Sequence, residues 1–428
     1  MIAIMEQIFA LEGSFFMLRV FEAFAGIGTQ RMALKRLGIA HEVIGISEIN
    51  THSIRTYEAI HGKTTNFGDI SKVDPQTLPD FDLLTYSFPC QDLSVAGKQQ
   101  GMIKGQTRSG LLYECEKIIE AKRPKYLLLE NVKNLVGRKF KPAFEEWLAY
   151  LESLGYTNYW QVLNSKHYGV PQNRERVFAV SILGEHEPYE FPKPFETIPS
   201  IKSVLEENVD EKYYLNQPFH ISSLKGFEAH PEEQIIRYLG KDLTLPCVCA
   251  SRGRYIDNPN SRVSGLPTQQ FLELNPNDTS NALTTVQKDN YIIEWVAQEA
   301  KRLAEKTRKE PIEVTVKPNK DLRPHRLDPK KSGLSELNIN YDENCAHVVT
   351  TSHAPKIYGV STDFRIRKMT PLECWRLMGI SDEDFQKAET VTTTTQLYRQ
   401  AGNAIVVDVL EAIFKALFDT DTSKGAPL

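Results

Sequence analysis

The sequence predicts an α/β fold in which a sheet with covering helices is joined to a smaller domain of short strands. Three observations carry this prediction. Residues 18–38 read as a strand, a glycine turn and a helix. Further strand and helix segments alternate from Glu42 to Leu154, which is typical of a sheet built from parallel strands. After Leu183 this alternation stops, and proline and asparagine become frequent.

Length and composition agree with a two-domain protein. The chain has 428 residues and a 41% apolar fraction, enough for a sizeable core and more than one typical domain needs. Its six cysteines, without a signal peptide, favour reduced thiols in a cytoplasm over a disulfide framework. Cys247-x-Cys249 has no matching pair at zinc spacing, so we expect no metal site.

Two further bounds concern the surface and the N-terminus. No apolar run approaches the roughly 20 residues that a membrane span needs. Residues 1–16 have two interpretations, an additional helix or leader residues upstream of a start at Met17. The net charge is −4, yet residues 301–331 hold eleven Lys and Arg against five Asp and Glu. That local excess suits either phosphate contact or a solvated helix face.

The first strand and its turn indicate a nucleotide-type cofactor site. Residues 18–24 form the strand, Gly26 and Gly28 the turn, and residues 29–37 the helix. Arg31 stands where a third glycine would complete the dinucleotide pattern. This disfavours a cofactor with a pyrophosphate and leaves room for S-adenosylmethionine.

Carboxylates follow the next two units of the pattern. The strand 42–47 ends at Glu48, where a carboxylate can bind two ribose hydroxyls. A third unit ends at Gly68-Asp69-Ile70, where Asp69 can accept from an adenine amino group while Ile70 packs on the ring. The alternatives are a surface glutamate and an aspartate that caps a turn.

The following strand presents a candidate nucleophile. The apolar run 81–86 leads into Pro89-Cys90, and the flanking residues are small or polar. A cysteine at a strand end, behind a proline, is held in one pose and is well placed to attack a substrate. A lone cysteine is more often buried and inert. Residues 93–105 contain three glycines and predict a mobile lid beside it.

Two later segments supply charged partners. The strand 124–129 ends in Glu130, on the same sheet edge as Cys90, where a carboxyl can serve as an acid or base. In Gln172-Asn173-Arg174-Glu175-Arg176, alternate residues share a face if the segment is extended, which suits binding of phosphate or carbonyl groups. The alternative is a surface ion-pair ladder with Glu175.

Ordered motifs run through the whole chain and resemble those of one family. The motifs are Phe24-Ala-Gly-Ile-Gly28, Glu48, Asp69, Pro89-Cys90-Gln91, Glu130-Asn131-Val132, Gln172-x-Arg174-x-Arg176, Arg367-x-x-Thr370-Pro371-x-Glu373-Cys374 and Gln400-x-Gly402-Asn403. Each is weak alone, but the ordered set resembles the C5-cytosine DNA methyltransferase family over about 20–183 and 361–418. The resemblance implies a Rossmann-like, S-adenosylmethionine-dependent methyltransferase sheet with a mostly irregular or β target-recognition domain.

The resemblance also implies domain limits and residue roles. Residues 1–183 would form the first part of the catalytic domain, 184–360 the target-recognition domain, and 361–428 a return to the catalytic domain. Cys90 would be the nucleophile, with Glu130, Arg174 and Arg176 completing the catalytic set. The cofactor would be S-adenosylmethionine, bound by Phe24, Gly26, Gly28, Glu48, Ile49, Asp69, Ile70, Pro89, Asn403 and Ala404.

Double-stranded DNA is the implied partner, because a target cytosine must be flipped out of the duplex to be reached. The residues expected to touch DNA are Gln91, Ser94, Val95, Gln172, Arg252, Arg254, Thr284 and Thr285. A restriction endonuclease for the same site is a further possible partner, and we expect a monomer. The alternatives are methylation of transfer RNA, a DNA-binding regulator without activity, and a nicotinamide-dependent dehydrogenase.

Overall fold

The computed structural model describes residues 17–93, 101–215, 219–221, 228–230, 235–238, 240–255, 268–284, 290–295, 356–357 and 364–418. Several expectations lie outside them: those on residues 1–16, Ser94, Val95, Thr285 and the basic stretch 301–331. The chain divides into two compact units. Unit 1 comprises 1–206, 279–287 and 370–428, and unit 2 comprises 207–278 and 288–369.

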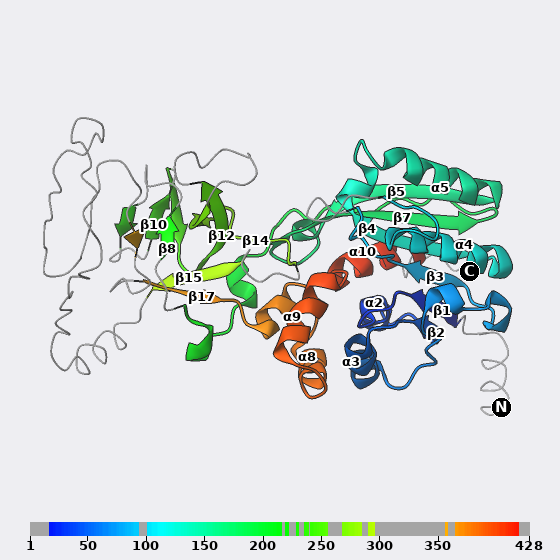
Figure 1. Ribbon diagram of the computed structural model, residues 1–428, viewed down its shortest axis with the longest axis horizontal. Coiled ribbons are helices and arrows are strands. Elements are labelled where there is room, and N and C mark those ends of the chain that lie inside the picture. Colours follow the sequence, from blue (N-terminus) through cyan, green and yellow to red (C-terminus); the bar gives the residue numbers. More distant parts are fainter. Residues whose placement is uncertain are drawn as a thin grey trace, which may run out of the picture. The chain divides into compact units, whose positions relative to one another are not determined.

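Unit 1 is built on a six-stranded sheet in the order β2-β1-β3-β4-β7-β5 (Figure 1). Its strands are β1 Leu18–Ala23, β2 His41–Ser47, β3 Leu83–Tyr86, β4 Tyr126–Val132, β5 Tyr156–Asn164 and β7 Glu175–Leu183. The strands from β2 to β4 are parallel, whereas β7 runs antiparallel to both β4 and β5. The predicted α/β sheet is therefore confirmed.

Helices cover both faces of this sheet because its central strands are apolar on both sides. Helices α4 (Leu112–Lys122) and α5 (Lys141–Ser153) pack on one face and share a core with β1, β3, β4 and β7 (Figure 1). Helix α10 (Val407–Phe418) lies on the other face, where the Phe418 ring meets Tyr126 edge-on at 5.2 Å between centroids. Helix α2 (Thr29–Arg36) packs beside α10.

One predicted strand is almost absent. The third unit of the pattern contributes only an isolated bridge between Ile46 and Asn66. The amide side chain of Asn66 binds the backbone of Glu48 and Gly68 instead, so the chain turns there and does not extend the sheet. Helix α3 (Thr51–His61) connects β2 to this segment.

The remaining parts of unit 1 come from distant stretches of sequence. Helix α7 (Pro371–Arg376) begins with a capping box between Thr370 and Glu373, as the Thr-Pro-x-Glu pattern predicts. Helices α8 (Asp382–Glu389) and α9 (Thr394–Asn403) follow it. Strand β14 (Ser280–Asn281) pairs with β6 (Gln172–Asn173), so residues 279–287 belong to unit 1. The sequence analysis did not foresee this return.

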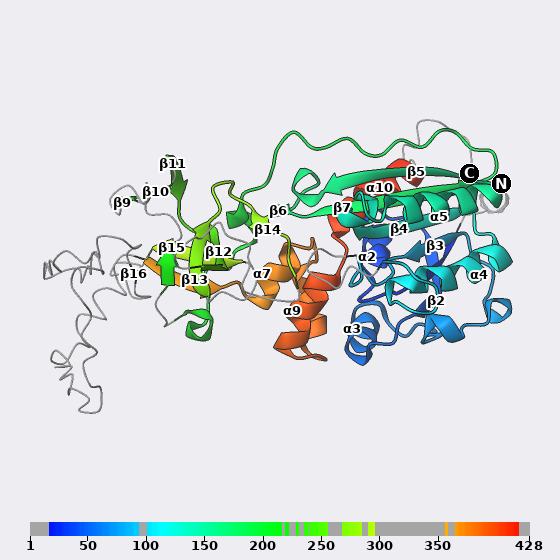
Figure 2. The ribbon, with the colours of Figure 1, turned by 45° about the horizontal axis from the view of Figure 1, so that its top comes forward.

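Unit 2 is predominantly β-structure among its described residues (Figure 2). Its larger sheet has the order β16-β8-β13-β12-β15-β17. The strands are β16 Lys356–Ile357, β8 Phe219–Ile221, β13 Thr268–Leu274, β12 Cys247–Tyr255, β15 Tyr291–Trp295 and β17 Phe364–Lys368. A second sheet joins β11 Lys241–Thr244, β10 Ile235–Tyr238 and β9 Glu228–His230.

A buried ion pair crosses the larger sheet of unit 2. Arg367 is almost fully buried, and its Nε lies 3.1 Å from an oxygen of Glu294 on the neighbouring strand. The hydroxyl of Tyr214 donates to the other oxygen of the same carboxylate. Burial of an arginine is tolerated here because its charge is paired. In the described part of the chain, no helix is long and apolar enough to cross a membrane.

Candidate active site

The glycine turn after β1 has the backbone geometry that the sequence predicts. Phe24, Gly26 and Gly28 all have left-handed φ values, of 56°, 58° and 76°. A Cβ added at Gly28 would lie 2.6 Å from atoms of both Tyr57 and His61, so only glycine fits there. A Cβ added at Gly26 would meet no atom within 4 Å. The turn therefore has no space for a side chain at Gly28, where the helix begins, and leaves space above the backbone at Gly26.

Glu48 is tied to this turn by backbone donors. Its carboxylate accepts from the N–H of Gly26 at 2.9 Å, of Ile49 at 2.9 Å and of Asn50 at 2.7 Å. Asn50 in turn caps α3 through its side chain. A carboxylate has about four acceptor sites. With three used, Glu48 has room for about one further donor, and not for the two hydroxyl contacts that the sequence analysis expected.

The neighbouring residues of the predicted cofactor set divide into exposed and buried ones. The Ile49 side chain is 71% exposed beside Glu48. Asp69 caps the short helix that follows it, using one oxygen, Oδ1, for the N–H and hydroxyl of Ser71. Ile70 is only 4% exposed and belongs to the core of unit 1. Only this small exposed part is open to the expected packing on a ring, which stays a prediction.

A buried polar pair below the turn was missed by sequence reasoning. Glu22 in β1 is fully buried and accepts a 2.6 Å hydrogen bond from the hydroxyl of Tyr57 in α3. Burial raises the pKa of Glu22 to about 7. The signal available in the sequence was a glutamate within the otherwise apolar part of this strand, residues 20–23.

The loop that carries Cys90 is held by side chains from elements on either side. Asn131 at the end of β4 donates to the carbonyl of Phe88 at 3.0 Å, and Asn134 donates to the carbonyl of Leu93 at 2.6 Å. The hydroxyl of Ser109 donates to the carbonyl of Pro89 at 2.6 Å. These contacts give Cys90 a fixed, partly exposed position, so the buried and inert alternative does not apply.

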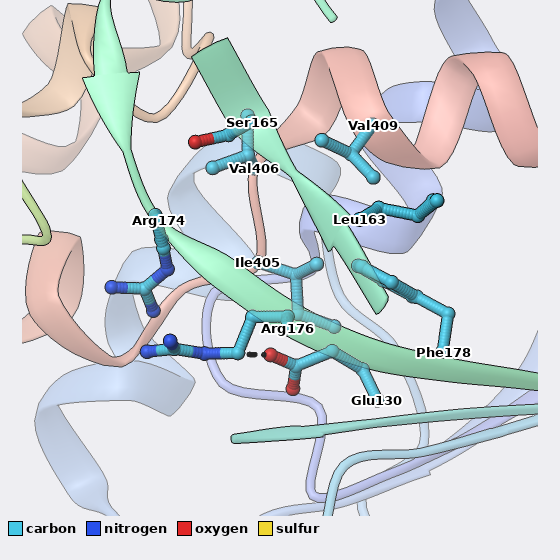
Figure 3. A pocket seen from close by; sticks show the side chains of 9 residues that line it. All are labelled: Glu130, Leu163, Ser165, Arg174, Arg176, Phe178, Ile405, Val406 and Val409. Atoms are coloured by element: carbon cyan, nitrogen blue, oxygen red, sulfur yellow. Dashed lines mark ion pairs between the residues drawn. The ribbon is translucent and has the colours of Figure 1, made fainter. Parts of the chain in front are cut away.

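Glu130 and Arg176 form an ion pair across the β4–β7 pair. The Nε of Arg176 lies 3.2 Å from Oε1 of Glu130, and both side chains are largely buried (Figure 3). Burial raises the pKa of the Glu130 carboxyl, while Arg176, Arg174 and a hydrogen bond from Ser87 oppose the rise. Glu175 pairs instead with Lys133, so there is no ladder of Glu175 with the arginines.

Cys90 is electrostatically connected to the same group of residues. Burial raises the pKa of its thiol, and the charge of Glu130 raises it further. Arg176 and Arg174 act in the opposite direction. The structure thus brings the predicted nucleophile, carboxyl and arginines into one electrostatic unit. Gln91, next to Cys90, is exposed and accepts from Arg108 at 2.8 Å.

Two residues of the predicted site have internal partners. Gln172 is fully buried, donates to the carbonyl of Leu377 at 2.8 Å and accepts from the N–H of Leu283 at 2.9 Å. Its expected contact with DNA is therefore wrong for this structure. Arg174 is 4% exposed and donates to the carbonyls of Leu283, Gly402 and Ala404. Its guanidinium is therefore bonded to backbone carbonyls of two other segments of unit 1.

A small pocket lies between β4, β7 and the C-terminal segment (Figure 3). Its lining combines Glu130, Arg174 and Arg176 with apolar side chains and Ser165. The apolar part includes Ile405 and Val406, which follow directly on Ala404. Of the two predicted C-terminal cofactor residues, Asn403 is exposed and Ala404 is buried.

The family model for C-5 cytosine-specific DNA methylase matches residues 18–419. The chain belongs to this family. It is a DNA (cytosine-5) methyltransferase. Its sequence is 36% identical to that of the type II methyltransferase M2.ScrFI of Lactococcus lactis subsp. cremoris, over 94% of this chain and 99% of the relative. It is 30% identical to the orphan methyltransferase M.Rho11sI of Bacillus phage rho11s, over 94% and 98%.

Solved structures agree on the fold of this methyltransferase. The Dnmt2 methyltransferase of S. pombe superposes with a TM-score of 0.55 at 18% identity, covering 94% of this chain and 98% of that one. The Entamoeba histolytica methyltransferase EhMeth gives a TM-score of 0.53 at 16% identity, covering the same shares. The predicted family and fold class are confirmed.

The residues that the sequence analysis placed in the target-recognition domain belong to different units of this methyltransferase. Arg252 and Arg254 lie two residues apart in β12 of unit 2. Thr284 is exposed and belongs to the segment that returns to unit 1. The described residues contain no cluster of three or more His, Cys, Asp or Glu that could hold a metal ion.

Proposed function

We propose that this methyltransferase transfers a methyl group from S-adenosylmethionine to carbon 5 of a flipped-out cytosine in duplex DNA, through a covalent adduct with Cys90. The observation that carries the proposal is the ion pair of Glu130 in β4 with Arg176 in β7, 3.2 Å between Oε1 and Nε, whose charges act on the thiol of Cys90 in the loop after β3. A nucleophile, an acid and a fixed cation are the groups that this reaction requires.

The residues around the glycine turn fit S-adenosylmethionine, whose sulfonium supplies the methyl group. The turn is open at Gly26, as close approach of the methionine part requires. Ile49 offers an exposed apolar surface to the adenine. The Oδ2 of Asp69, which has a long 3.9 Å contact with the ammonium of Lys72, can accept from the adenine amino group. Glu48 would bind one ribose hydroxyl directly, next to the backbone of the turn. Phe24, Pro89 and Asn403 complete the proposed set.

Cys90 makes the base reactive. Its thiolate attacks carbon 6 of cytosine, a bond forms between Sγ and this carbon, and the electron pair of the ring moves toward N3. Carbon 5 then has the electron density to take the methyl group. Loss of the proton from carbon 5, return of the N3 proton to its donor and breakage of the bond to Sγ restore the aromatic ring and release Cys90. Water is our choice for the base that takes this proton.

Glu130 supplies the proton that N3 requires. Burial raises its pKa, so the protonated carboxyl persists to a higher pH than in an exposed glutamate. Protonation also removes the negative charge that raises the pKa of Cys90, leaving Arg176 and Arg174 to favour the thiolate. A neutral Glu130 therefore favours the thiolate form of Cys90 and also protonates the cytosine ring. Arg176, beside it, would hold the cytosine carbonyl oxygen.

Sequence recognition is assigned to unit 2. We propose that Arg252 and Arg254 in β12 of unit 2 contact DNA, joined by Thr284 and Thr285 of the 279–287 segment of unit 1. Gln91, Ser94 and Val95 close on the flipped base. Arginine is the commonest reader of guanine in the major groove. The type II and orphan names of the relatives suggest a role in restriction–modification or as a solitary modification enzyme, acting as a monomer in a bacterial or phage-infected cytoplasm.

A duplex with 5-fluorocytosine at the target position tests the covalent step. Fluorine cannot leave as a cation, so the ring cannot be restored and the adduct persists. We expect a denaturation-resistant complex whose mass is the sum of the protein, the duplex and one methyl group. The Cys90→Ala variant should form none and should transfer no tritium from labelled S-adenosylmethionine. Normal methyl transfer by Cys90→Ala would refute the mechanism.

Bisulfite sequencing of DNA from cells that express the protein tests the substrate and reads the recognition sequence. Methylated cytosines should occur within one sequence context. A methylation rate on transfer RNA that equals or exceeds the rate on duplex DNA would overturn the choice of DNA. Failure to bind S-adenosylmethionine in calorimetry would overturn the choice of cofactor.

A further inference from the structure

Arg174 connects two distant stretches of unit 1. Its Nη1 donates to the carbonyl of Leu283 at 2.8 Å. Its Nη2 donates to the carbonyls of Gly402 at 3.1 Å and Ala404 at 3.0 Å. The guanidinium is buried, so these carbonyls are its principal hydrogen-bond partners in the described structure.

The first partner lies on the peptide that joins two parts of the recognition unit. Residues 279–287 belong to unit 1, whereas 207–278 before them and 288–369 after them form unit 2. Leu283 is also held through its N–H by Gln172, and Ser280 pairs with Gln172 through the backbone. Both polar backbone groups of Leu283 are thus bonded to the Gln172–Arg174 segment. Thr284, a proposed DNA contact, is the next residue.

The other two partners flank the proposed cofactor residue Asn403. Gly402 precedes it and Ala404 follows it, at the end of α9. The same helix is tied to the middle of α3 through Gln400, which donates to the hydroxyl of Thr56 at 2.9 Å. A shift of the Asn403 backbone on cofactor binding would therefore act directly on Arg174.

We propose that Arg174 is a positioning residue that couples cofactor binding to DNA binding. The proposal rests on the proposed function, because it requires Asn403 to touch the cofactor and the 279–287 segment to set the recognition unit. One planar guanidinium bridges both sides, so ordering of either carbonyl group favours the arrangement of the other. Linkage then requires each ligand to tighten the other by the same factor.

The variant Arg174→Lys tests the hydrogen bonds to the three carbonyls separately from the positive charge of the arginine. Lysine keeps a positive charge near Cys90 and Glu130, but its single ammonium group lacks the planar fork that reaches three carbonyls. Asn173→Ala is the matched control. It changes the adjacent residue, whose side chain is exposed and binds Asn164.

The coupling is measured by calorimetry with S-adenosylhomocysteine and a duplex that carries the mapped methylation site. We expect the wild-type protein and Asn173→Ala to bind the duplex about 5-fold or more tightly when S-adenosylhomocysteine is saturating. For Arg174→Lys the ratio should fall to about 1, while both ligands still bind. A ratio near 1 in the wild-type protein, or an unchanged ratio in Arg174→Lys, overturns the proposal.

Hydrogen exchange provides a second measurement that needs only the wild-type protein, in case Arg174→Lys does not fold. S-adenosylhomocysteine alone, without DNA, should increase the protection of amides in a peptide spanning residues 279–284. No change there would overturn the proposal. Failure of the proposed function has a different signature, because the protein would then bind neither S-adenosylhomocysteine nor the duplex.

Discussion

The two halves of the unit 1 sheet build their parts of the site in different ways. On the β2–β1–β3 side, the groups around the glycine turn are close in sequence: Gly26 and Glu48 are 22 residues apart, and Glu48 and Asn66 are 18 apart. On the β4–β7 side, Gln172 binds Leu377 across 205 residues, and Arg174 binds Gly402 across 228. The glycine-turn part of the cofactor side is local, although Asn403 comes from α9, which is bonded to α3 across 344 residues. The reaction side depends throughout on distant segments.

This difference shows what each half contributes. Local backbone donors hold Glu48 and leave it one further acceptor site, which suits binding. Long-range packing buries Glu130 and raises the pKa of its carboxyl, which suits proton transfer. Substitutions on the β2–β1–β3 side should therefore change the affinity for the cofactor. Substitutions on the β4–β7 side should change the rate of methyl transfer, the free energy of unfolding or the pKa of the Cys90 thiol.

The largest effect is expected for Glu130→Gln on the β4–β7 side. It removes the proposed acid and should reduce the single-turnover rate of methyl transfer by about 10²- to 10⁴-fold. Affinity for S-adenosylmethionine in calorimetry should stay within about 2-fold of the wild-type protein, well below the effect of a lost charge-assisted hydrogen bond. Glu175→Gln, one residue from Arg176, is the control and should retain activity. Weakened cofactor binding in Glu130→Gln would mean that the β4–β7 side also determines cofactor affinity, which contradicts the proposed division between the two sides.

On the β2–β1 side, Glu48→Ala should weaken binding of S-adenosylmethionine by roughly 10- to 100-fold. It deletes a charged acceptor for three backbone N–H groups and for the ribose, and such hydrogen bonds contribute about 1.5–3 kcal/mol. Glu42→Ala, in the strand β2 that precedes Glu48, is the control, because its exposed carboxylate pairs with Arg19 at a long 3.9 Å. Calorimetry measures both. Equal affinity in Glu48→Ala and Glu42→Ala would remove Glu48 from the cofactor site.

Gln172→Met tests whether the long-range side depends on buried hydrogen bonds. The change keeps the side-chain volume but leaves the N–H of Leu283 and the carbonyl of Leu377 without partners. The free energy of unfolding of unit 1 should fall by about 1–3 kcal/mol in urea denaturation. Gln76→Met, at an exposed position, should change it by less than about 0.5 kcal/mol. Full stability in Gln172→Met would mean that the segment is held by other contacts.

The smallest expected effect concerns the thiol of Cys90. Burial and the charge of Glu130 both raise its pKa, so alkylation by iodoacetamide should reach its half-maximal rate at a higher pH than for a free cysteine. Glu130→Gln removes one cause and should lower this midpoint by up to about one pH unit. Mass spectrometry of the Cys90 peptide follows the reaction. A midpoint that rises in Glu130→Gln would contradict the proposed coupling.

The sequence by itself determined the family, the sheet, and the residues that stand at strand ends. Glu48 directly follows β2, Cys90 lies four residues past β3, and Glu130 lies near the end of β4. Parallel strands present these ends at one edge, so the proximity of the three residues follows from the order of the chain. The glycine turn was predictable for the same local reason. The capping box at the start of α7 was also predictable from the sequence, because Thr370 and Glu373 are three residues apart.

Only the tertiary structure decided which polar residues face a ligand and which are internal. Gln172 and Arg174 share a motif with Arg176, yet β14 and the C-terminal segment cover the first two. Ile70 lies in the core, whereas Ile49 is exposed. Burial raises the pKa of the Glu130 carboxyl, and its surroundings combine residues of β5 and β7 with Ile405 and Val406 of the C-terminal segment. The apolar strand favours a raised pKa from the sequence alone, but the contribution of the C-terminal segment is visible only in the tertiary structure.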